Sequence, residues 1–273
     1  MSTAGIVYRH TRATRILHWI NALCVFLVLM SGLQIFNAHP RLHWGKSGAD
    51  TDPALVAIGA ERSLGKLVGV VVIGHTEFPT TGVLGVSAGP YGNPSVRAFP
   101  RWATIPSYQD LATGRRWHFF FAWILVINSF IYLVVSFLNR HVQRDLLPGR
   151  GELSIRHFFV EIWEHARLRF PRGEAARHYN LLQKLTYLFV IFVLGPLILG
   201  TGLTMSPGID AAAPWLLQLF GGRQSARTIH FIAAMLIVVF IFVHLLMVML
   251  AGPINELRSM ITGRYVLPAE KSK

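Results

Sequence analysis

The chain has 273 residues, 52% of them hydrophobic and only 14% charged, which excludes an ordinary soluble domain and indicates a protein that crosses a membrane several times. Its formal net charge of +13 fits the basic cytoplasmic segments of a membrane protein and contact with anionic lipid. The sequence contains no motif that would point to nucleic acid instead. The single cysteine, Cys24, excludes an intramolecular disulfide, a CxxCH haem attachment and an iron–sulfur cluster.

The first apolar segment, residues 16–36, has no formal charge and follows a short basic N-terminus. A cleaved signal peptide is the competing interpretation, but the segment is longer than a typical signal-peptide core and has no clear cleavage site. We therefore predict a retained transmembrane helix with His18 near its basic end.

The connector of residues 37–116 is rich in Gly and Pro. Loops of this length are seldom structureless and are usually functional. Within it, residues 67–74 are too short to span a membrane and predict either a strand or a re-entrant segment. For the connector as a whole, two interpretations stay open: a surface that docks a partner, or a lid packed on the helices.

Three more apolar segments predict the remaining spans, at residues 117–139, 185–205 and 228–250. Gly195 and Pro196 predict a kink in the middle of the third span.

The basic connector of residues 140–184 contains a segment, residues 153–170, in which apolar residues recur at helical spacing with charges between them. This pattern predicts an amphipathic helix on the membrane surface. The whole chain, residues 1–273, is thus predicted to be one all-α membrane domain. It would be a four-transmembrane-helix bundle with a long extracytoplasmic loop after the first helix and the surface helix between the second and third.

The distribution of Lys and Arg predicts the orientation. Residues 1–15, 140–184 and 252–273 would share one side of the membrane and together hold 16 Lys and Arg, against 10 in the longer segments of the other side. The positive-inside rule places this basic side, with both termini, in the cytoplasm. The long first connector would then lie outside.

Four histidines fall within the spans. His230 and His244 lie 14 residues apart, almost four helical turns, so both imidazoles leave the same helix face, roughly 21 Å from each other. By depth in the membrane, His18 matches His244, and His118, at the start of the second span, matches His230, at the start of the fourth.

Each matched pair comes from two helices and is placed to hold a planar cofactor between its rings. Two imidazoles on an iron porphyrin give a six-coordinate haem suited to electron transfer. The alternative is that each histidine hydrogen-bonds a neighbouring helix as a packing contact. A zinc site would require three or four ligands at one depth. We expect the other eight histidines to be solvated: His10, His39, His43, His75, His141, His157, His165 and His178.

The chain resembles the di-haem cytochrome b membrane subunits of bacterial respiratory enzymes, the family of the formate dehydrogenase-N gamma subunit and hydrogenase cytochrome b. The residues that carry the resemblance are Arg15-Ile16-Leu17-His18-Trp19, Ser31-Gly32, His118, and His230 with His244. The resemblance implies a multi-pass protein of the bacterial inner membrane that binds two haem b groups. It implies that His18 with His244, and His118 with His230, are the axial ligands of the two irons.

The resemblance also extends to smaller features. Gly32 and Gly202 correspond to small residues that let a porphyrin approach the helices, although glycines also serve helix contacts and helix ends. Asn180 and Gln183 belong to a segment that resembles the family's quinone site. An amide can donate a hydrogen bond to a quinone carbonyl, and Asn180 would equally suit the N-cap of the third span.

The function implied by the resemblance is electron transfer between the quinone pool and a periplasmic redox partner. The long first connector is more similar to the cytochrome b partners of molybdopterin oxidoreductases than to the formate dehydrogenase subunit. The chain alone would carry half of a redox reaction, so whether it is an enzyme by itself is left open. Two alternatives are a self-contained oxidase of superoxide or another small reductant, and a haem-free membrane anchor.

Overall fold

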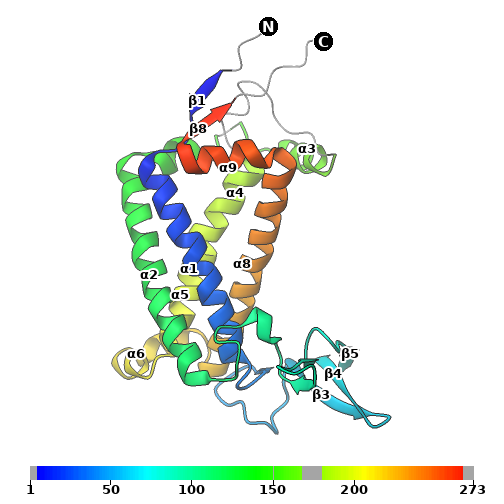
Figure 1. Ribbon diagram of the computed structural model, residues 1–273. Coiled ribbons are helices and arrows are strands. Elements are labelled where there is room, and N and C mark those ends of the chain that lie inside the picture. The colour runs from blue at the N-terminus through cyan, green and yellow to red at the C-terminus, as the bar shows by residue number, and fades with distance from the viewer. Residues whose placement is uncertain (1–4, 150, 168–179, 267–273) are drawn as a thin grey trace. The chain divides into compact units, whose positions relative to one another are not determined.

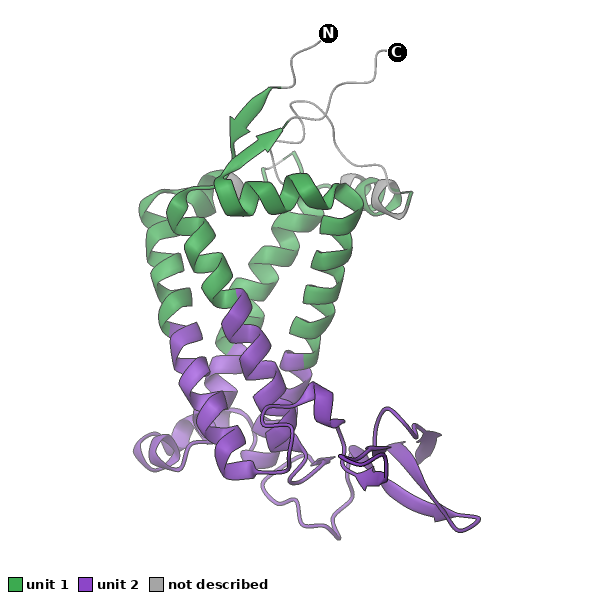
Figure 2. Ribbon diagram, viewed as in Figure 1, with its two compact units in different colours: residues 1–21, 127–196, 235–273 green, residues 22–126, 197–234 purple. Residues whose placement is uncertain are grey.

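The computed structural model describes residues 5–149, 151–167 and 180–266 (Figure 1). The chain divides into two compact units, shown in Figure 2. Unit 1 comprises residues 1–21, 127–196 and 235–273, and unit 2 comprises residues 22–126 and 197–234.

Four long helices dominate the described chain. They are α1 (Arg12–Phe36), α2 (Leu111–Leu138), the helix of residues 181–204, and α8 (Arg223–Ala251). Each is long and apolar enough to cross a membrane. Few of their large apolar side chains are buried within the chain, as expected for residues that face lipid, which confirms the predicted helical membrane protein.

The helix of residues 181–204 is interrupted where Gly195 and Pro196 predict a kink. It consists of α4 (Leu181–Phe189), a π-helical turn (Val190–Leu194) and α5 (Gly195–Thr204). Pro196 has no N–H to donate to the preceding turn, and a wider turn is a common way for a helix to accommodate that loss.

A capping side chain, rather than the edge of the apolar segment, sets where α2 begins. Asp110 precedes α2, and its carboxylate accepts hydrogen bonds from the N–H of Thr113 at 3.0 Å and from the Thr113 hydroxyl at 2.7 Å. These bonds hold the pKa of Asp110 below its usual value. Since α2 begins at Leu111 and α8 at Arg223, the expectation that His118 and His230 open their helices is wrong. Both lie about two turns inside.

The connector of residues 37–116, in unit 2, forms β-structure, so the all-α expectation is wrong for this part of the chain. Strands β2 (Arg41–Leu42), β3 (Val56–Ser63), β4 (Lys66–Ile73) and β5 (Thr76–Pro79) form an antiparallel sheet in that order. The segment predicted as a strand or a re-entrant piece is strand β4. A second ladder joins β6 (Val86–Ala88) to β7 (Pro94–Val96), followed by a 3₁₀ turn (Arg101–Ala103).

This connector packs on helix residues of its own unit. Phe36, at the end of α1, shares a buried core with Leu42, Ile58 and Ala98 of the connector. The ring of Phe231, in α8, stacks on Phe36 with centroids 4.7 Å apart. This packing supports the interpretation of the connector as a lid on the helices, and docking of a partner stays a prediction. Two short helices, α6 (Pro207–Ala212) and α7 (Pro214–Leu219), precede α8.

In unit 1, the two ends of the described chain meet. Strand β1 (Ile6–Tyr8) pairs antiparallel with β8 (Arg264–Val266), which follows helix α9 (Pro253–Thr262). Arg9 forms an ion pair with Glu256 at 3.3 Å, and its guanidinium lies over the ring of Tyr265.

The basic connector of unit 1 contains a π-helical turn (Val142–Leu146) and helix α3 (Ile155–Ala166). The carboxylate of Glu161, in α3, accepts hydrogen bonds from the N–H groups of Leu181 and Leu182 at the start of α4. The amphipathic helix expected over residues 153–170 is therefore present as α3, and the residues after 167 in that segment lie outside the described chain. Its position on a membrane surface stays a prediction.

Candidate haem-binding sites

The two predicted histidine pairs are both brought together, and each lies within one unit. In unit 1, the ring centroids of His18, on α1, and His244, on α8, are 6.4 Å apart, with an angle of 54° between the ring planes. In unit 2, the centroids of His118, on α2, and His230, on α8, are 6.3 Å apart at 63°. We call these the unit-1 pair and the unit-2 pair.

The separation within each pair fits two imidazoles that bind one metal ion from opposite sides. Two metal–imidazole bonds of about 2 Å, together with roughly 1 Å from each nitrogen to its ring centre, place such centroids about 6 Å apart. Direct packing of two rings also occurs at this distance. The hydrogen bonds of the rings show which nitrogen of each imidazole is free to bind a metal.

The hydrogen bonds of His118 fix its tautomer. Its Nδ1 lies 3.0 Å from the main-chain carbonyl oxygen of Val28, on α1. A carbonyl oxygen only accepts hydrogen bonds, so Nδ1 carries the hydrogen and Nε2 keeps a free lone pair. The hydroxyl of Ser31 lies 3.4 Å from the same Nδ1 and donates to the carbonyl of Leu27. An imidazole held in this way is the form that binds a metal.

His230 is held by a matching contact. Its Nδ1 lies 3.1 Å from Oγ1 of Thr201, on α5, and the Thr201 hydroxyl donates to the carbonyl of Leu197 at 2.7 Å. The single hydroxyl hydrogen is thereby used, and Thr201 accepts from His230. Nε2 of His230 is again left as the acceptor, so in both rings of the unit-2 pair the Nε2 lone pair is available to a metal ion.

Glycine beside each hydroxyl residue makes room for the ring. A Cβ on Gly32 would lie 3.3 Å from Cε1 of His118, and a Cβ on Gly202 would lie 3.3 Å from Cε1 of His230. The structure thus gives both glycines a role in seating an imidazole. Their predicted role in approaching a porphyrin stays a prediction.

Thr201 has no role in the predictions from the sequence, and Ser31 enters them only as part of a family motif. A signal for both is present in the sequence. Ser31-Gly32-Leu33 and Thr201-Gly202-Leu203 repeat one pattern of a hydroxyl residue followed by glycine and leucine. Both copies face a histidine of the unit-2 pair.

The unit-1 pair is held mainly by ring packing. Trp19 contacts the edge of His18 with centroids 5.4 Å apart, and Phe240 stacks on His244 at 5.9 Å and 23°. Nδ1 of His18 is buried and has no hydrogen-bond partner among the residues that the structure describes. His10, in the same unit, has its pKa lowered to about 4 by burial and by the nearby positive charge of Arg9.

Asn180 and Gln183, the predicted quinone residues, lie in unit 1 at the start of α4. Oδ1 of Asn180 accepts from the Gln183 N–H at 2.8 Å, and Oε1 of Gln183 accepts from the Asn180 N–H at 3.3 Å. This reciprocal capping box confirms the N-cap interpretation of Asn180. It engages the amide oxygens, whereas a quinone carbonyl would bind an amide NH₂ group, so binding of a quinone stays a prediction.

The expectation of eight solvated histidines is wrong for His43, which is 2% exposed. Its Nδ1 lies 3.2 Å from the carbonyl oxygen of Pro53, and its ring stacks on His39. Burial and the nearby positive charge of Arg227 lower the pKa of His39. His43 is buried because it lies against Gly48 and Pro53 of its own loop and against α8, where the Thr228 hydroxyl donates to the His43 carbonyl oxygen at 2.6 Å.

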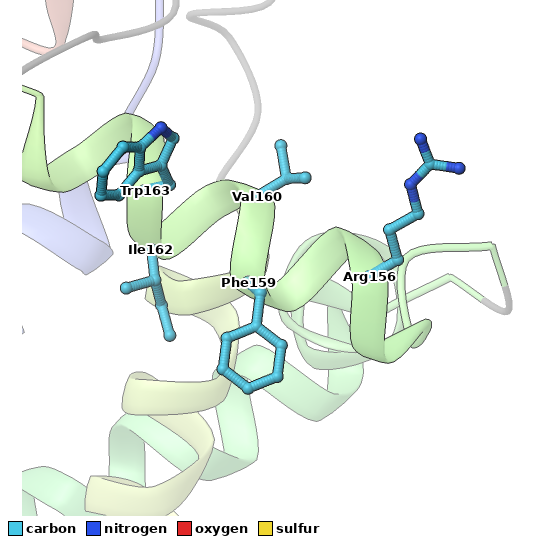
Figure 3. A pocket seen from close by; sticks show the side chains of 5 residues that line it. All are labelled: Arg156, Phe159, Val160, Ile162 and Trp163. Atoms are coloured by element: carbon cyan, nitrogen blue, oxygen red, sulfur yellow. The ribbon is translucent and has the colours of Figure 1, made fainter.

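Helix α3 carries a shallow hollow lined by Arg156, Phe159, Val160, Ile162 and Trp163 (Figure 3). Phe159 and Ile162 project from one side of the helix, and Val160 and Arg156 project from the other. Exposed aromatic and aliphatic side chains next to a cation are typical of a helix at a lipid–water interface.

Residues 9–263 match the family model of the prokaryotic cytochrome b561. The chain is also 31% identical over 153 residues, 56% of its length, to the Azospira oryzae protein named Putative protein-methionine-sulfoxide reductase subunit YedZ1, of which the match covers 72%. Because the family model matches nearly the whole chain, the chain belongs to the prokaryotic cytochrome b561 family. It is a multi-pass bacterial membrane cytochrome that binds haem b, as the resemblance predicted.

Proposed function

We propose that this chain is a di-haem b subunit that carries electrons between the quinone pool and a periplasmic oxidoreductase. The observation that carries the proposal is the presence of two histidine pairs with nearly equal ring separations, 6.4 and 6.3 Å, one in each unit. Haem b supplies reversible one-electron chemistry at its iron when it is bound.

The protein's own residues would hold and orient the two cofactors. His18 and His244 would bind one iron, and His118 and His230 the other. Ligation from both sides leaves no open position for a substrate, which favours electron transfer over catalysis at the iron. The hydrogen bonds from Nδ1 to Val28 and Thr201 raise the basicity of the second pair of ligands and fix their ring orientation.

We place the outer partner at the connector of residues 37–116. Its surface exposes large aromatic side chains, among them Tyr91 at 95% and Trp102 at 77%. Aromatic residues of this kind are enriched at the centres of protein interfaces. The similarity to a protein-methionine-sulfoxide reductase subunit supports an oxidoreductase that acts on methionine sulfoxide as the partner. The family resemblance of the long connector points to a molybdopterin cofactor in that partner. Electrons would then flow from quinol to the partner.

Quinol would react in unit 1, which contains both the unit-1 pair and Asn180. The segments of residues 140–184 and 252–273 would face the cytoplasm of a bacterial inner membrane, together with both termini. The connector of residues 37–116 would face the periplasm. Exposed apolar residues on α3 would rest against the lipid headgroups.

The test of the proposal is the haem content of the purified protein. A pyridine haemochrome assay should give two haem b per chain, and the oxidised protein should show the spectrum of low-spin iron with two histidine ligands. One haem, or none, in well-folded protein would refute the di-haem proposal. Rapid oxidation of superoxide by the purified subunit without any partner would instead favour a self-contained oxidase.

The partner is tested by shortening the β3–β4 hairpin in register, removing residues 61–68, which include the exposed turn at Leu64. In membranes of the source organism, quinol-driven reduction of methionine sulfoxide should fall while both haems stay bound. Trp163→Ala, on exposed α3 of unit 1, is the matched control and should leave this reduction unchanged. Unchanged reduction both after hairpin removal and in the double variant Tyr91→Ala with Trp102→Ala would show that the partner docks elsewhere.

A further inference from the structure

Arg97 is a buried cation in unit 2 whose hydrogen-bonding groups are only partly satisfied. It follows β7 and is 5% exposed. Its Nη1 donates to the carbonyl of Ser107 at 2.8 Å, and its Nη2 donates to Oε1 of Gln34 at 3.0 Å and to Oγ1 of Thr104 at 2.9 Å. Its buried Nε has no hydrogen-bond partner among the described residues.

The three groups that contact Arg97 are all neutral. No carboxylate pairs with it in the part of the chain that the structure describes, and the charged neighbour that affects it is another cation, Arg101. Burial and this neighbour both lower the pKa of Arg97. A guanidinium with an unpaired N–H at this depth is stable only when an anion or further acceptors complete its environment.

The position of Arg97 connects it to the unit-2 pair. Gln34, its partner on α1, is 2% exposed and lies one helical turn beyond Ser31, which contacts Nδ1 of His118. On α2, Gly114 lies one turn before His118, and a Cβ on Gly114 would be 2.9 Å from Cγ of Gln34. Gln34 therefore lies one turn from His118, toward the connector, and holds Arg97 there.

We propose that Arg97 binds a carboxylate of the haem held by His118 and His230, an inference that rests on the proposed function. Haem b has two carboxylate groups on one edge of an otherwise apolar ring. A planar guanidinium matches a carboxylate in shape and charge, and it remains charged when buried. The unpaired Nε is the donor that the structure leaves for this contact.

Arg227, a partly buried arginine near this site, is already linked to an acid through His39. It lies one turn before His230 on α8, and its guanidinium donates to Nδ1 of His39 at 2.7 Å and to the His39 carbonyl oxygen. His39 in turn lies 3.4 Å from the carboxylate of Asp50. Arg97 has no such link to an acid among the described residues, which makes it the stronger anchor for a cofactor carboxylate.

A cation at a haem carboxylate has a measurable consequence. It stabilises the reduced haem relative to the oxidised haem, because the oxidised iron carries one more positive charge. It also keeps the carboxylate ionised. Removing the cation should therefore lower the midpoint potential of that haem and let its carboxylate take up a proton at a higher pH.

The experiment compares Arg97→Gln and Arg97→Lys with the wild type and with Arg101→Gln, the matched loss of a neighbouring charge. Redox titration from pH 5.5 to 8.5 measures both midpoint potentials. Infrared difference spectra with haem labelled by ¹³C at its carboxylates report the ionisation of those groups. Haem content and thermal unfolding are measured on every variant.

In Arg97→Gln, we expect the midpoint potential of one haem to fall and to become pH-dependent. The infrared spectrum of the labelled haem should then show the band of a protonated carboxylic acid. Arg97→Lys should keep the potential near the wild-type value but shift the labelled carboxylate band, because the N–H donor at Nε is lost. Arg101→Gln should change neither the pH dependence nor the labelled bands. If Arg97→Gln does not fold, the band shift in Arg97→Lys decides the question.

Unchanged labelled bands in both Arg97 variants would overturn the inference. If bound phospholipid per chain fell at the same time, the anion at Arg97 would be a lipid phosphate. The proposed function fails if the wild type does not bind two haems. This inference fails if both haems are bound and the labelled carboxylate bands do not change in the Arg97 variants.

Discussion

Nδ1 of His230 lies 3.1 Å from Oγ1 of Thr201, and the Thr201 hydroxyl donates its own hydrogen to the carbonyl of Leu197. This relationship assigns the proton of the imidazole to Nδ1 and leaves the lone pair of Nε2 available to a metal ion. Two separate helices, α5 and α8, thus cooperate in preparing one side of the unit-2 site. The same arrangement at His118 uses the carbonyl of Val28 on α1.

Thr201→Val keeps the shape of the side chain and removes the acceptor for His230. We expect both haems to bind, with one lost roughly 10-fold faster, because outer hydrogen bonds to a ligand typically change affinity by this amount or more. Haem transfer to apomyoglobin measures the loss rate. Thr186→Val is the control, since Thr186 is exposed and its hydroxyl makes the same bond to the carbonyl four residues earlier. Equal rates in the two variants would contradict a role for Thr201.

His118→Ala should remove the haem of unit 2 and leave that of unit 1, so the pyridine haemochrome yield should fall from two to one. Quinol should still reduce the remaining haem in stopped-flow experiments. His75→Ala, on the exposed connector, should keep both haems. If His118→Ala abolished reduction of the remaining haem by quinol, the quinone site would lie at the unit-2 pair instead.

Asn180 has two possible roles, and two substitutions separate them. Asn180→Asp keeps the acceptor that caps α4 but removes the amide donor, whereas Asn180→Ala removes both. Loss of the cap should destabilise the protein by about 1 kcal/mol. Loss of a hydrogen bond to a quinone carbonyl, worth about 1 kcal/mol, should slow reduction by quinol several-fold. We expect slow reduction in both variants and reduced thermal stability only in Asn180→Ala. Wild-type reduction in Asn180→Asp would leave Asn180 with the cap alone.

His10 predicts a dependence of stability on pH. Its pKa in the folded protein is lowered to about 4 by burial and by Arg9, from 6.5 in an unfolded chain. Between these values the unfolded chain binds more protons, so stability is complete above pH 6.5 and falls as the pH drops toward 4. Between pH 7.5 and pH 5, the free energy of unfolding of His10→Gln should fall by roughly 1–2 kcal/mol less than that of the wild type. Thermal unfolding in detergent at several pH values measures this. Parallel curves for the two proteins would rule out His10 as the source.

Two glycines on paired strands of the connector should respond differently to alanine. A Cβ on Gly69 would lie 2.2 Å from the carbonyl oxygen of Leu84, whereas a Cβ on Gly59 meets nothing within 4 Å. Gly69→Ala should destabilise the connector by about 1–3 kcal/mol, because only main-chain movement relieves the overlap. Gly59→Ala should leave it unchanged or slightly more stable. Limited proteolysis of the connector compares the two, and equal cleavage would contradict the close approach of β4 to Leu84.

The sequence alone predicted the four spans and both histidine pairs. The reason is that helix length and the 3.6-residue period are local properties, so hydrophobic runs and the spacing of His230 and His244 carry them directly. The sequence also indicated the N-cap role of Asn180, because a capping box involves residues only three apart.

Only the tertiary structure decided how the histidines of unit 2 are held, where Arg97 lies and how the connector folds. Gln34 and Arg97 are 63 residues apart in sequence, and Ser31 and His118 are 87 apart. Contacts of that range depend on which turn of one helix faces which turn of another, and a hydrophobic pattern does not encode this. His43 and Arg97 are buried through contacts of the connector with Thr228 of α8 and Gln34 of α1, which are likewise non-local. Local periodicity determined the elements and the spacing of their histidines, while long-range packing decided the hydrogen bonds that hold His118 and His230 with Nε2 as an acceptor.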